Sequence, residues 1–222
     1  RHIIVINSTV VLDKALLIIM AKWHGFGRCK TRLSRDIGKS NSAKVQSVMT
    51  NHTISVAKSI QNYKQIDISI AISGLGEKNC KRWSKELGIE KFNIQGKGCL
   101  GEKMKRQIII NKNFCNKNKI KKIIFIGTDL PDLCHLDLLN TIKELRENDL
   151  ILGPSNDGGY WLFGLSEKII SKHLNLPFIN ISWGKENVLQ NTLNNLTSIK
   201  LRYKFLDKKI DIDTITDIEN RK

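Results

Sequence analysis

Residues 15–33 of this chain read ALLIIMAKWHGFGRCKTRL, and this stretch decides the fold that we expect. The run Ala15–Ala21 is apolar throughout, which is typical of a strand buried on both faces of a parallel sheet. It opens into the loop Trp23–Leu33, where two glycines stand among three cationic side chains. Glycine lets backbone amides approach a ligand closely, and the cations add positive charge. A loop of this kind at the end of a strand is suited to holding a diphosphate.

Strand-like and helix-like segments alternate along the rest of the chain, which has 222 residues. This alternation predicts a single α/β domain, in which a mostly parallel sheet is flanked by helices. Val48 and His52 are expected on the buried face of a helix at residues 42–60, with His52 as a packed core histidine. The expected strands are 15–21, 68–72, 92–95, 123–126, 150–152, 160–165 and 199–205, and the expected helices are 42–60, 79–87, 102–111 and 136–147, with another after Ser182-Trp183-Gly184.

The formal net charge is +16, which raises the possibility of nucleic-acid binding. The excess is mostly lysine, however, and it is spread along the chain with abundant asparagine and isoleucine. The densest basic stretch, Lys103–Lys122, contains Phe114 as its single aromatic residue, so it lacks interleaved platforms for stacking bases. We expect a solvated helix face and linker there, and no nucleic-acid partner. A non-catalytic nucleic-acid-binding protein stays open as a third alternative.

Five dispersed cysteines, with no CxxC pair, indicate reduced thiols and a cytoplasmic protein. The apolar N-terminal stretch is interrupted by Asn7, Asp13 and Lys14, and no run is long enough for a membrane span. Residues 1–14 are therefore expected to be an N-terminal extension of a domain that covers residues 15–222.

Asp129 directly follows the strand-like run Ile123–Ile126. Ligands of open α/β sheets bind beyond the carboxyl ends of the strands, and carboxylate oxygens are preferred ligands of Mg²⁺ and Mn²⁺. The residue types therefore favour a metal ligand at Asp129. The alternative, a cap for the following helix, is less attractive because Pro131 and further residues intervene. Asp132 is a weaker candidate, since it could cap the turn after Pro131.

Two further acidic segments carry candidate chemistry. Asn156-Asp157-Gly158-Gly159 is either a tight turn or a backbone-lined pocket in which Asp157 meets substrate hydroxyls or acts as a base, and the two interpretations are compatible. Asp211-Ile212-Asp213 places two acids on one side of an extended segment. That pair could complete a metal site, or it could belong to a solvated tail.

Taken together, five stretches resemble a known family. They are AKWHGFGRCKTRL (21–33), GTDLPDL (127–133), GPSNDGGYWLFGL (153–165), WGKENVL (183–189) and DIDTITDI (211–218). In this order they resemble bacterial GT-A-fold glycosyltransferases that are associated with radical-SAM proteins and proposed to act in arsenosugar biosynthesis. That family is similar in turn to nucleotidyltransferases such as those that make molybdopterin guanine dinucleotide. The resemblance covers almost all of the chain after Lys14.

The resemblance implies a GT-A, or nucleotide-diphospho-sugar transferase, fold with a divalent metal, Mg²⁺ or Mn²⁺. It implies that Asp129 takes the metal-binding acidic position and that Asp157 lines the acceptor or sugar pocket. We further expect Asp213 to be a second metal ligand and Asp157 to be the catalytic residue that orients or deprotonates the acceptor. His24 stands where such sequences usually have proline, which affects the stiffness of the loop. The implied phosphate-binding residues are Gly25, Gly27, Arg28, Lys30 and Arg32, and the implied pocket residues are Gly158 and Gly159.

The function expected on these grounds is metal-dependent transfer of a sugar from a nucleotide-diphosphate sugar to a small-molecule acceptor. The runner-up is a nucleotidyltransferase that attacks the α-phosphate of a nucleoside triphosphate and releases pyrophosphate. Both reactions need the basic loop and the metal-binding acid, because both develop negative charge on phosphate oxygens.

Overall fold

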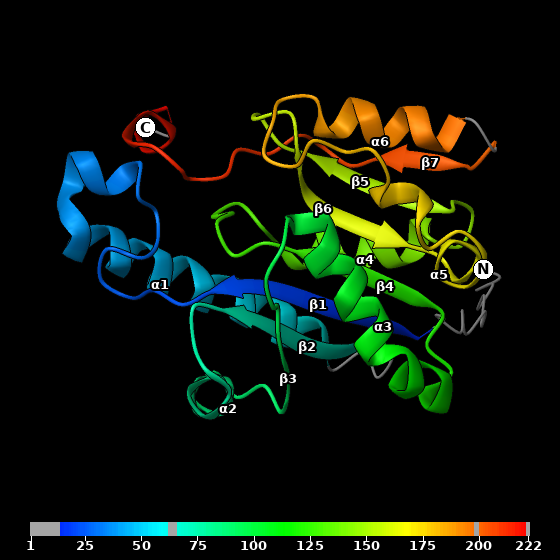
Figure 1. The fold of residues 1–222 in the computed structure, drawn as a ribbon, viewed down its shortest axis with the longest axis horizontal. Coiled ribbons are helices and arrows are strands. Elements are labelled where there is room, and N and C mark those ends of the chain that lie inside the picture. The colour runs from blue at the N-terminus through cyan, green and yellow to red at the C-terminus, as the bar shows by residue number, and fades with distance from the viewer. Residues whose placement is uncertain (1–13, 62–65, 198–199, 221–222) are drawn as a thin grey trace, which may run out of the picture.

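A twisted sheet of seven strands forms the centre of the protein (Figure 1). The structure is a computed structural model, and it describes residues 14–61, 66–197 and 200–220. The strand order is β3-β2-β1-β4-β6-β5-β7. The strands are β1 (Ala15–Lys22), β2 (Ile66–Ser73), β3 (Lys91–Ile94), β4 (Lys122–Ile126), β5 (Leu150–Pro154), β6 (Tyr160–Leu165) and β7 (Tyr203–Phe205).

Only β6 runs against the other strands of this sheet. Strand β1 is parallel to both of its neighbours, β2 and β4, while β6 is antiparallel to β4 and β5. The carboxyl ends of the parallel strands therefore meet at one edge, on the left in Figure 1. The expectation of a single α/β domain with a mostly parallel sheet is confirmed.

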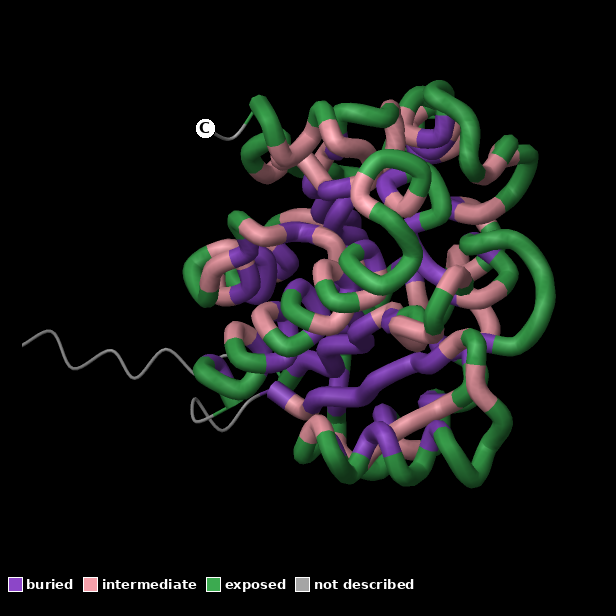
Figure 2. The backbone as a smooth tube through the Cα atoms, turned by 90° about the vertical axis from the view of Figure 1, so that its left-hand side faces the viewer, coloured by how far each residue is buried: buried purple, intermediate pink, exposed green. Residues whose placement is uncertain are grey.

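Helices cover both faces of the sheet, and the sequence of β1 shows why. Leu17 and Ile19 point into one hydrophobic cluster, whereas Leu16 and Ile18 point into the other. Successive side chains of a strand alternate between faces, so a strand with a helical layer on each side must be apolar at every position. Figure 2 shows the resulting buried band between exposed outer layers. The helices are α1 (Leu33–Gln61), α2 (Glu77–Glu86), α3 (Leu100–Asn118), α4 (His135–Glu144), α5 (Glu167–Lys172), η1 (Leu176–Phe178), α6 (Val188–Thr197) and α7 (Ile215–Glu219).

The sequence-based boundaries differ from the structure at a few places. Helix α1 begins nine residues earlier than expected, because two helices join across a kink at Gly38 (φ 81°, ψ 158°). Val48 was expected on its buried face and is 68% exposed, so that expectation is wrong. Lys122 is buried at the start of β4, and its ammonium donates to the Ile142 carbonyl, so it does not belong to the solvated face. His52 is half-buried, with Nε2 3.0 Å from the Leu133 carbonyl oxygen.

Some expectations fall on residues outside the described ranges. The expected strand at 199–205 is seen as β7, and residues 198–199 are not described. The proposed extension at residues 1–14 likewise lies outside the described residues apart from Lys14. Among the described residues, every helix is too short or too polar to cross a lipid bilayer.

The C-terminal segment returns across the carboxyl edge of the sheet. The Lys209 amide donates to the Pro154 carbonyl (3.1 Å), and the Ile212 amide donates to the Asp129 carbonyl (3.0 Å). Ile212 is buried with Leu33 and Met49 of α1, so the segment and α7 pack against the N-terminal half of that helix. In Figure 1, α7 accordingly lies beside α1 near the C-terminal label. This return brings the acids near residue 211 to the same edge as the loop after β1.

Candidate functional site

The loop after β1 turns a lysine inward. The Arg28 amide donates to the Gly25 carbonyl (2.9 Å), which closes a turn through Gly27, whose φ of 67° suits glycine. Lys30 follows with a φ of 45°, and its side chain is only 3% exposed. The loop is therefore shaped so that one of its three cations leaves the surface and points toward the carboxyl edge of the sheet.

The Lys30 ammonium lies between two carboxylates. Its Nζ is 2.8 Å from Asp129 Oδ2 and 2.9 Å from Asp213 Oδ1. Burial would lower the pKa of Lys30, but the charges of the two acids outweigh it and raise the pKa above the ordinary value. Lys30 therefore stays charged. Arg32, which is 70% exposed, lies 3.9 Å from Asp213 at the rim.

Backbone contacts hold both acids in place. Asp129 follows the buried strand β4, and its carbonyl accepts the Ile212 amide described above. Asp217 accepts hydrogen bonds from the Asp213 amide (2.9 Å) and from the amide and hydroxyl of Thr214 (2.6 and 2.8 Å) at the start of α7. Burial raises the pKa of Asp217, but these hydrogen bonds outweigh it and lower the pKa.

Asp129 does not cap the next helix. The N-cap of α4 is Cys134, whose amide donates to Asp137 Oδ2 (2.8 Å) in a capping box. The carboxylate of Asp129 is thus left to the Lys30 centre, which removes the alternative that the sequence left open for it.

Two cavities meet at this centre, and Met20 and Asp129 line both of them. The first cavity, of about 250 Å³, is polar, and we call it the basic cavity. The second, of about 310 Å³, has mostly apolar walls, and we call it the aromatic cavity. The basic cavity is otherwise lined by Lys22, Lys30, Thr31, Arg32, Gln46, Thr128 and Asp213. Such a polar recess joined to an apolar one can hold a ligand with a charged part and a ring-bearing part.

Glycines make room for the large walls of the aromatic cavity. A Cβ on Gly153 would come within 2.4 Å of the Trp161 indole, and one on Gly101 within 2.4 Å of the Trp183 indole. Tyr160 stacks on Phe163 with ring centroids 4.9 Å apart, and burial raises the pKa of its phenol. The indoles of Trp161 and Trp183 and the ring of Tyr160 therefore define the shape of this cavity.

Two more carboxylates reach the aromatic cavity. Asp157 Oδ1 accepts from the Ser155 hydroxyl and from the Gly159 amide (3.0 Å), so the tight turn and the pocket interpretations hold together. Asp211 lines the same cavity rather than facing Lys30. Burial, and to a smaller extent the nearby charges of Asp157, Asp129 and Asp213, raise the pKa of Asp211 to about 6.

The structure brings some of the candidate residues together and leaves others apart. Lys30, Asp129 and Asp213 meet directly, Arg32 lies at the rim, and Asp157 and Gly159 line the aromatic cavity. By contrast, Gly25, Gly27, Arg28 and Gly158 line neither cavity. A Cβ on Gly158 would come within 1.9 Å of the Glu186 carbonyl oxygen, so this glycine permits close backbone packing.

Sequence reasoning missed the aromatic walls and part of the basic cavity. Trp161 and Trp183 lie within stretches that carry the family resemblance, but an aromatic residue in or near a strand is usually a core residue. Lys22 and Gln46 carried no signal of their own. Gln46 donates to the Thr128 hydroxyl (3.1 Å), which ties α1 to the end of β4 beneath the basic cavity.

The carboxylates at Lys30 fit a divalent cation. In the described part of the chain, no three His, Cys, Asp or Glu side chains form a metal-binding group by themselves. Asp129 and Asp213 nevertheless converge on one point, where a single positive charge is held at 2.8–2.9 Å. Mg²⁺ is commonly bound by one or two carboxylates together with substrate phosphates. The two carboxylates therefore provide a donor set of the kind that this arrangement uses.

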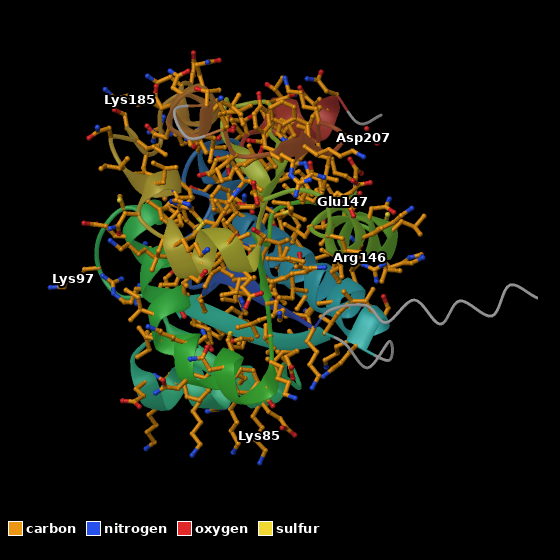
Figure 3. The ribbon with its side chains drawn as sticks, turned by 90° about the vertical axis from the view of Figure 1, so that its right-hand side faces the viewer. Lys85, Lys97, Arg146, Glu147, Lys185 and Asp207 are labelled. Atoms are coloured by element: carbon orange, nitrogen blue, oxygen red, sulfur yellow. The ribbon has the colours of Figure 1, made fainter. Side chains whose placement is uncertain are left out.

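The remaining positive charge is dispersed. The labelled residues Lys85, Lys97, Arg146 and Lys185 project from different parts of the surface in Figure 3. Arg106, within the densest basic stretch, donates to the Gln95 and Lys97 carbonyls instead of facing outward as a free cation. Of the three cations that line the basic cavity, only Lys30 is buried, whereas Lys22 and Arg32 are exposed.

Comparison with known proteins places these features in a family and a fold. Residues 56–185 match the family model described as "Uncharacterized protein conserved in bacteria (DUF2064)". No curated protein shows significant sequence similarity to the chain.

Solved structures of several transferases share the fold. A protein of Desulfovibrio desulfuricans G20, described as a "putative nucleotide-diphospho-sugar transferase", superposes with a TM-score of 0.77 at 24% identity, over 93% of this chain and 85% of that chain. The 4-diphosphocytidyl-2C-methyl-D-erythritol synthase of Anaerococcus prevotii matches with a TM-score of 0.56 at 14% identity, over 94% and 96% of the chains. Rv0371c of Mycobacterium tuberculosis H37Rv, in complex with manganese, matches at 0.52 and 14%, over 94% and 97%. The domain therefore has the GT-A-like fold of nucleotide-diphospho-sugar transferases.

Proposed function

Because the chain belongs to the bacterial DUF2064 family and has a GT-A-like fold, we propose that it is a metal-dependent glycosyltransferase. In this proposal a nucleotide-diphosphate sugar gives its sugar to a small-molecule acceptor. The association with radical-SAM proteins and arsenosugar biosynthesis, which the sequence resemblance implies, belongs to the same proposal and concerns the identity of the acceptor.

One observation carries the proposal: a buried ammonium and two carboxylates meet where the basic and aromatic cavities join. Loss of a sugar from a nucleotide-diphosphate sugar leaves negative charge on the departing diphosphate. Lys30, Lys22 and Arg32 line the basic cavity and would stabilise that charge where it develops. A divalent cation held by Asp129 and Asp213 would supply further stabilisation of the same phosphate oxygens.

The aromatic cavity would receive the reacting sugar and the acceptor. A bond forms between the acceptor oxygen or nitrogen and the anomeric carbon, and the bond from that carbon to the diphosphate oxygen breaks with its electron pair. The acceptor proton passes to the carboxylate of Asp157, which also orients the acceptor. Gly158 and Gly159 complete the turn that positions Asp157, and in this proposal Gly25, Gly27 and Arg28 contact the nucleotide.

A second candidate is nucleotidyl transfer with release of pyrophosphate. Its support is that structures named as nucleotidyltransferases share the fold, among them the Anaerococcus prevotii synthase. The same Lys30 centre would then stabilise a departing pyrophosphate. Binding of nucleic acid without catalysis is a third possibility, and it predicts a steeply salt-dependent affinity for DNA or RNA that persists in Asp129→Ala.

The two transferase reactions differ in the nucleotide product. We would incubate the full chain and Mg²⁺ or Mn²⁺ with labelled nucleotide sugars, and in parallel with labelled nucleoside triphosphates, in the presence of an acceptor mixture. Free nucleoside diphosphate supports glycosyl transfer, whereas pyrophosphate supports the second candidate. Either activity should be lost in Lys30→Met and kept in Lys85→Met, which removes an exposed cation of α2 that lines neither cavity. Full activity of Lys30→Met would contradict both proposals.

A further inference from the structure

The two cavities that meet at Asp129 differ sharply in charge. The basic cavity contains three cations, Lys22, Lys30 and Arg32, against the two carboxylates of Asp129 and Asp213. The aromatic cavity contains Asp157 and Asp211 besides Asp129, and its one basic lining residue is the exposed Lys185. A bound substrate would therefore experience a change from positive to negative surroundings along its length.

The carboxylates of the aromatic cavity are not equally compensated. Asp129 shares the Lys30 ammonium with Asp213. In contrast, neither Asp157 nor Asp211 has an ion-pair partner among the described residues. Ionised carboxylates only accept hydrogen bonds, so a ligand that satisfies them must donate.

The walls of the same cavity add an independent requirement. Tyr160, Trp161 and Trp183 line it, and the two indoles are held at fixed positions above Gly153 and Gly101. Rigid aromatic walls favour a ligand with an apolar or ring face that can pack against them. They also exclude water, which strengthens the repulsion between the carboxylates and any anion that enters.

From this juxtaposition we propose that the acceptor is a hydroxyl- or amine-bearing compound with an apolar ring face and no negative charge. This inference rests on the proposed function, since it takes the aromatic cavity as the acceptor side of the site. It also separates the two transferase reactions. Transfer of a nucleotidyl group to a phosphorylated acceptor would bring a phosphate next to Asp157 and Asp211, where like charges repel. A neutral or cationic nucleophile has no such conflict and is suited to attack on an anomeric carbon.

The test compares two ligands that differ in one group. Phenyl β-D-glucoside is neutral, whereas phenyl β-D-glucuronide carries a carboxylate at C6 in place of the hydroxymethyl group. Their dissociation constants for the full chain would be measured by ligand-observed NMR at pH 7.5 and low salt, with Mg²⁺ and pyrophosphate present to occupy the basic cavity. We expect the glucoside to bind at least tenfold more tightly than the glucuronide. The preference should weaken in 0.5 M NaCl, because salt screens the charges that face the opening of the cavity.

Variants assign the preference to the two carboxylates. In Asp157→Asn/Asp211→Asn the preference should fall to less than threefold. Glu90→Gln/Glu147→Gln is the matched control, because it removes two exposed carboxylates that line neither cavity and changes the net charge equally. Glu147 lies on the face shown in Figure 3, which is opposite the carboxyl edge of the sheet. Circular dichroism spectra would establish that both double variants are folded.

Three results would overturn the inference. They are equal or tighter binding of the glucuronide by the wild type, a preference that the Asp157→Asn/Asp211→Asn variant retains, and failure of both glycosides to bind. A separate measurement addresses the proposed function. If pyrophosphate with Mg²⁺ fails to bind in a calorimetric titration, the diphosphate site is wrong, whatever the preference between the two glycosides.

Discussion

The ammonium of Lys30 allows a quantitative test of the centre, through the substitution Lys30→Met. Methionine keeps the length and apolar character of the side chain but removes the charge that Asp129 and Asp213 share. Removing one partner of a fully buried ion pair costs about 3–5 kcal/mol, because a charge is left without compensation. Here the two carboxylates are each 38% exposed, so water can solvate them in part. We therefore expect a loss of about 2 kcal/mol in the free energy of unfolding.

The measurement is urea denaturation in the presence of a chelator, with thermal unfolding alongside. In a chain of this length, about 2 kcal/mol corresponds to a fall of roughly 4–8 °C in the midpoint of thermal unfolding. Arg32→Met is the control, because its exposed guanidinium lies 3.9 Å from Asp213 and should contribute less than about 0.5 kcal/mol.

Adding Mn²⁺ extends the same test. In the wild type a cation must displace Lys30 from the two carboxylates, whereas in Lys30→Met they are already vacant. A cation that binds the folded state raises stability by mass action, so the increase with Mn²⁺ should be larger in the variant. The reasoning would be refuted if Lys30→Met unfolded within about 0.5 kcal/mol of the wild type in chelator. A smaller increase with Mn²⁺ in the variant would contradict the assignment of the carboxylates to a metal.

Three further predictions concern single residues. Asp211→Asn should stabilise the protein at pH 7.5 but not at pH 4. The pKa of Asp211 is raised to about 6 in the folded state, so between pH 3.8 and 6 the folded state binds more protons than the unfolded state, and the contribution of this group to stability is lost as the pH rises through that window. Thermal midpoints of variant and wild type in chelator that differ equally at both pH values would contradict this prediction. Gly101→Ala should cost about 1–3 kcal/mol and alter the fluorescence of Trp183, since its Cβ would overlap the indole, whereas Gly76→Ala, with nothing within 4 Å, should be nearly neutral. Asp217→Asn should cost about 1 kcal/mol at pH 7 in a denaturant titration, and the difference should disappear as the pH falls through the lowered pKa of Asp217, below 3.8; a difference that persists at pH 2 would argue against the role of its charge.

The layers of the fold follow from local sequence patterns, and the strands of the sheet are therefore predictable. Strand β1 is apolar at every position from Ala15 to Ala21, and β4 is apolar from Ile123 to Ile126, so both strands are expected to lie between two layers of helices. The early start of α1 was not predictable, because the kink at Gly38 joins segments that look separate in the sequence. Local sequence patterns predict the strands and helices and their alternation along the chain, but not irregularities such as this kink, which depend on tertiary packing.

The candidate site was likewise only partly predictable from the sequence. The position of Asp129 directly after β4 follows from the sequence, because strand ends share an edge. The inward turn of Lys30 does not follow, since it depends on Asp213, 183 residues further along the chain. The aromatic cavity was missed for a similar reason: Trp183, in the turn before α6, packs over Gly101 of α3, and no local pattern links the two. The functional roles of these residues stay predictions until the variants are measured.

The return of the C-terminal segment has a consequence for biosynthesis. Ribosomes synthesise a chain from its N-terminus to its C-terminus. Strands β1 to β6 and Lys30 therefore emerge well before Asp211 and Asp213. A nascent chain can thus assemble most of its sheet before Asp211 and Asp213, two of the four acids at the two cavities, have emerged. The candidate site would be completed only at the end of synthesis, when β7 has docked and the C-terminal segment crosses back over the sheet.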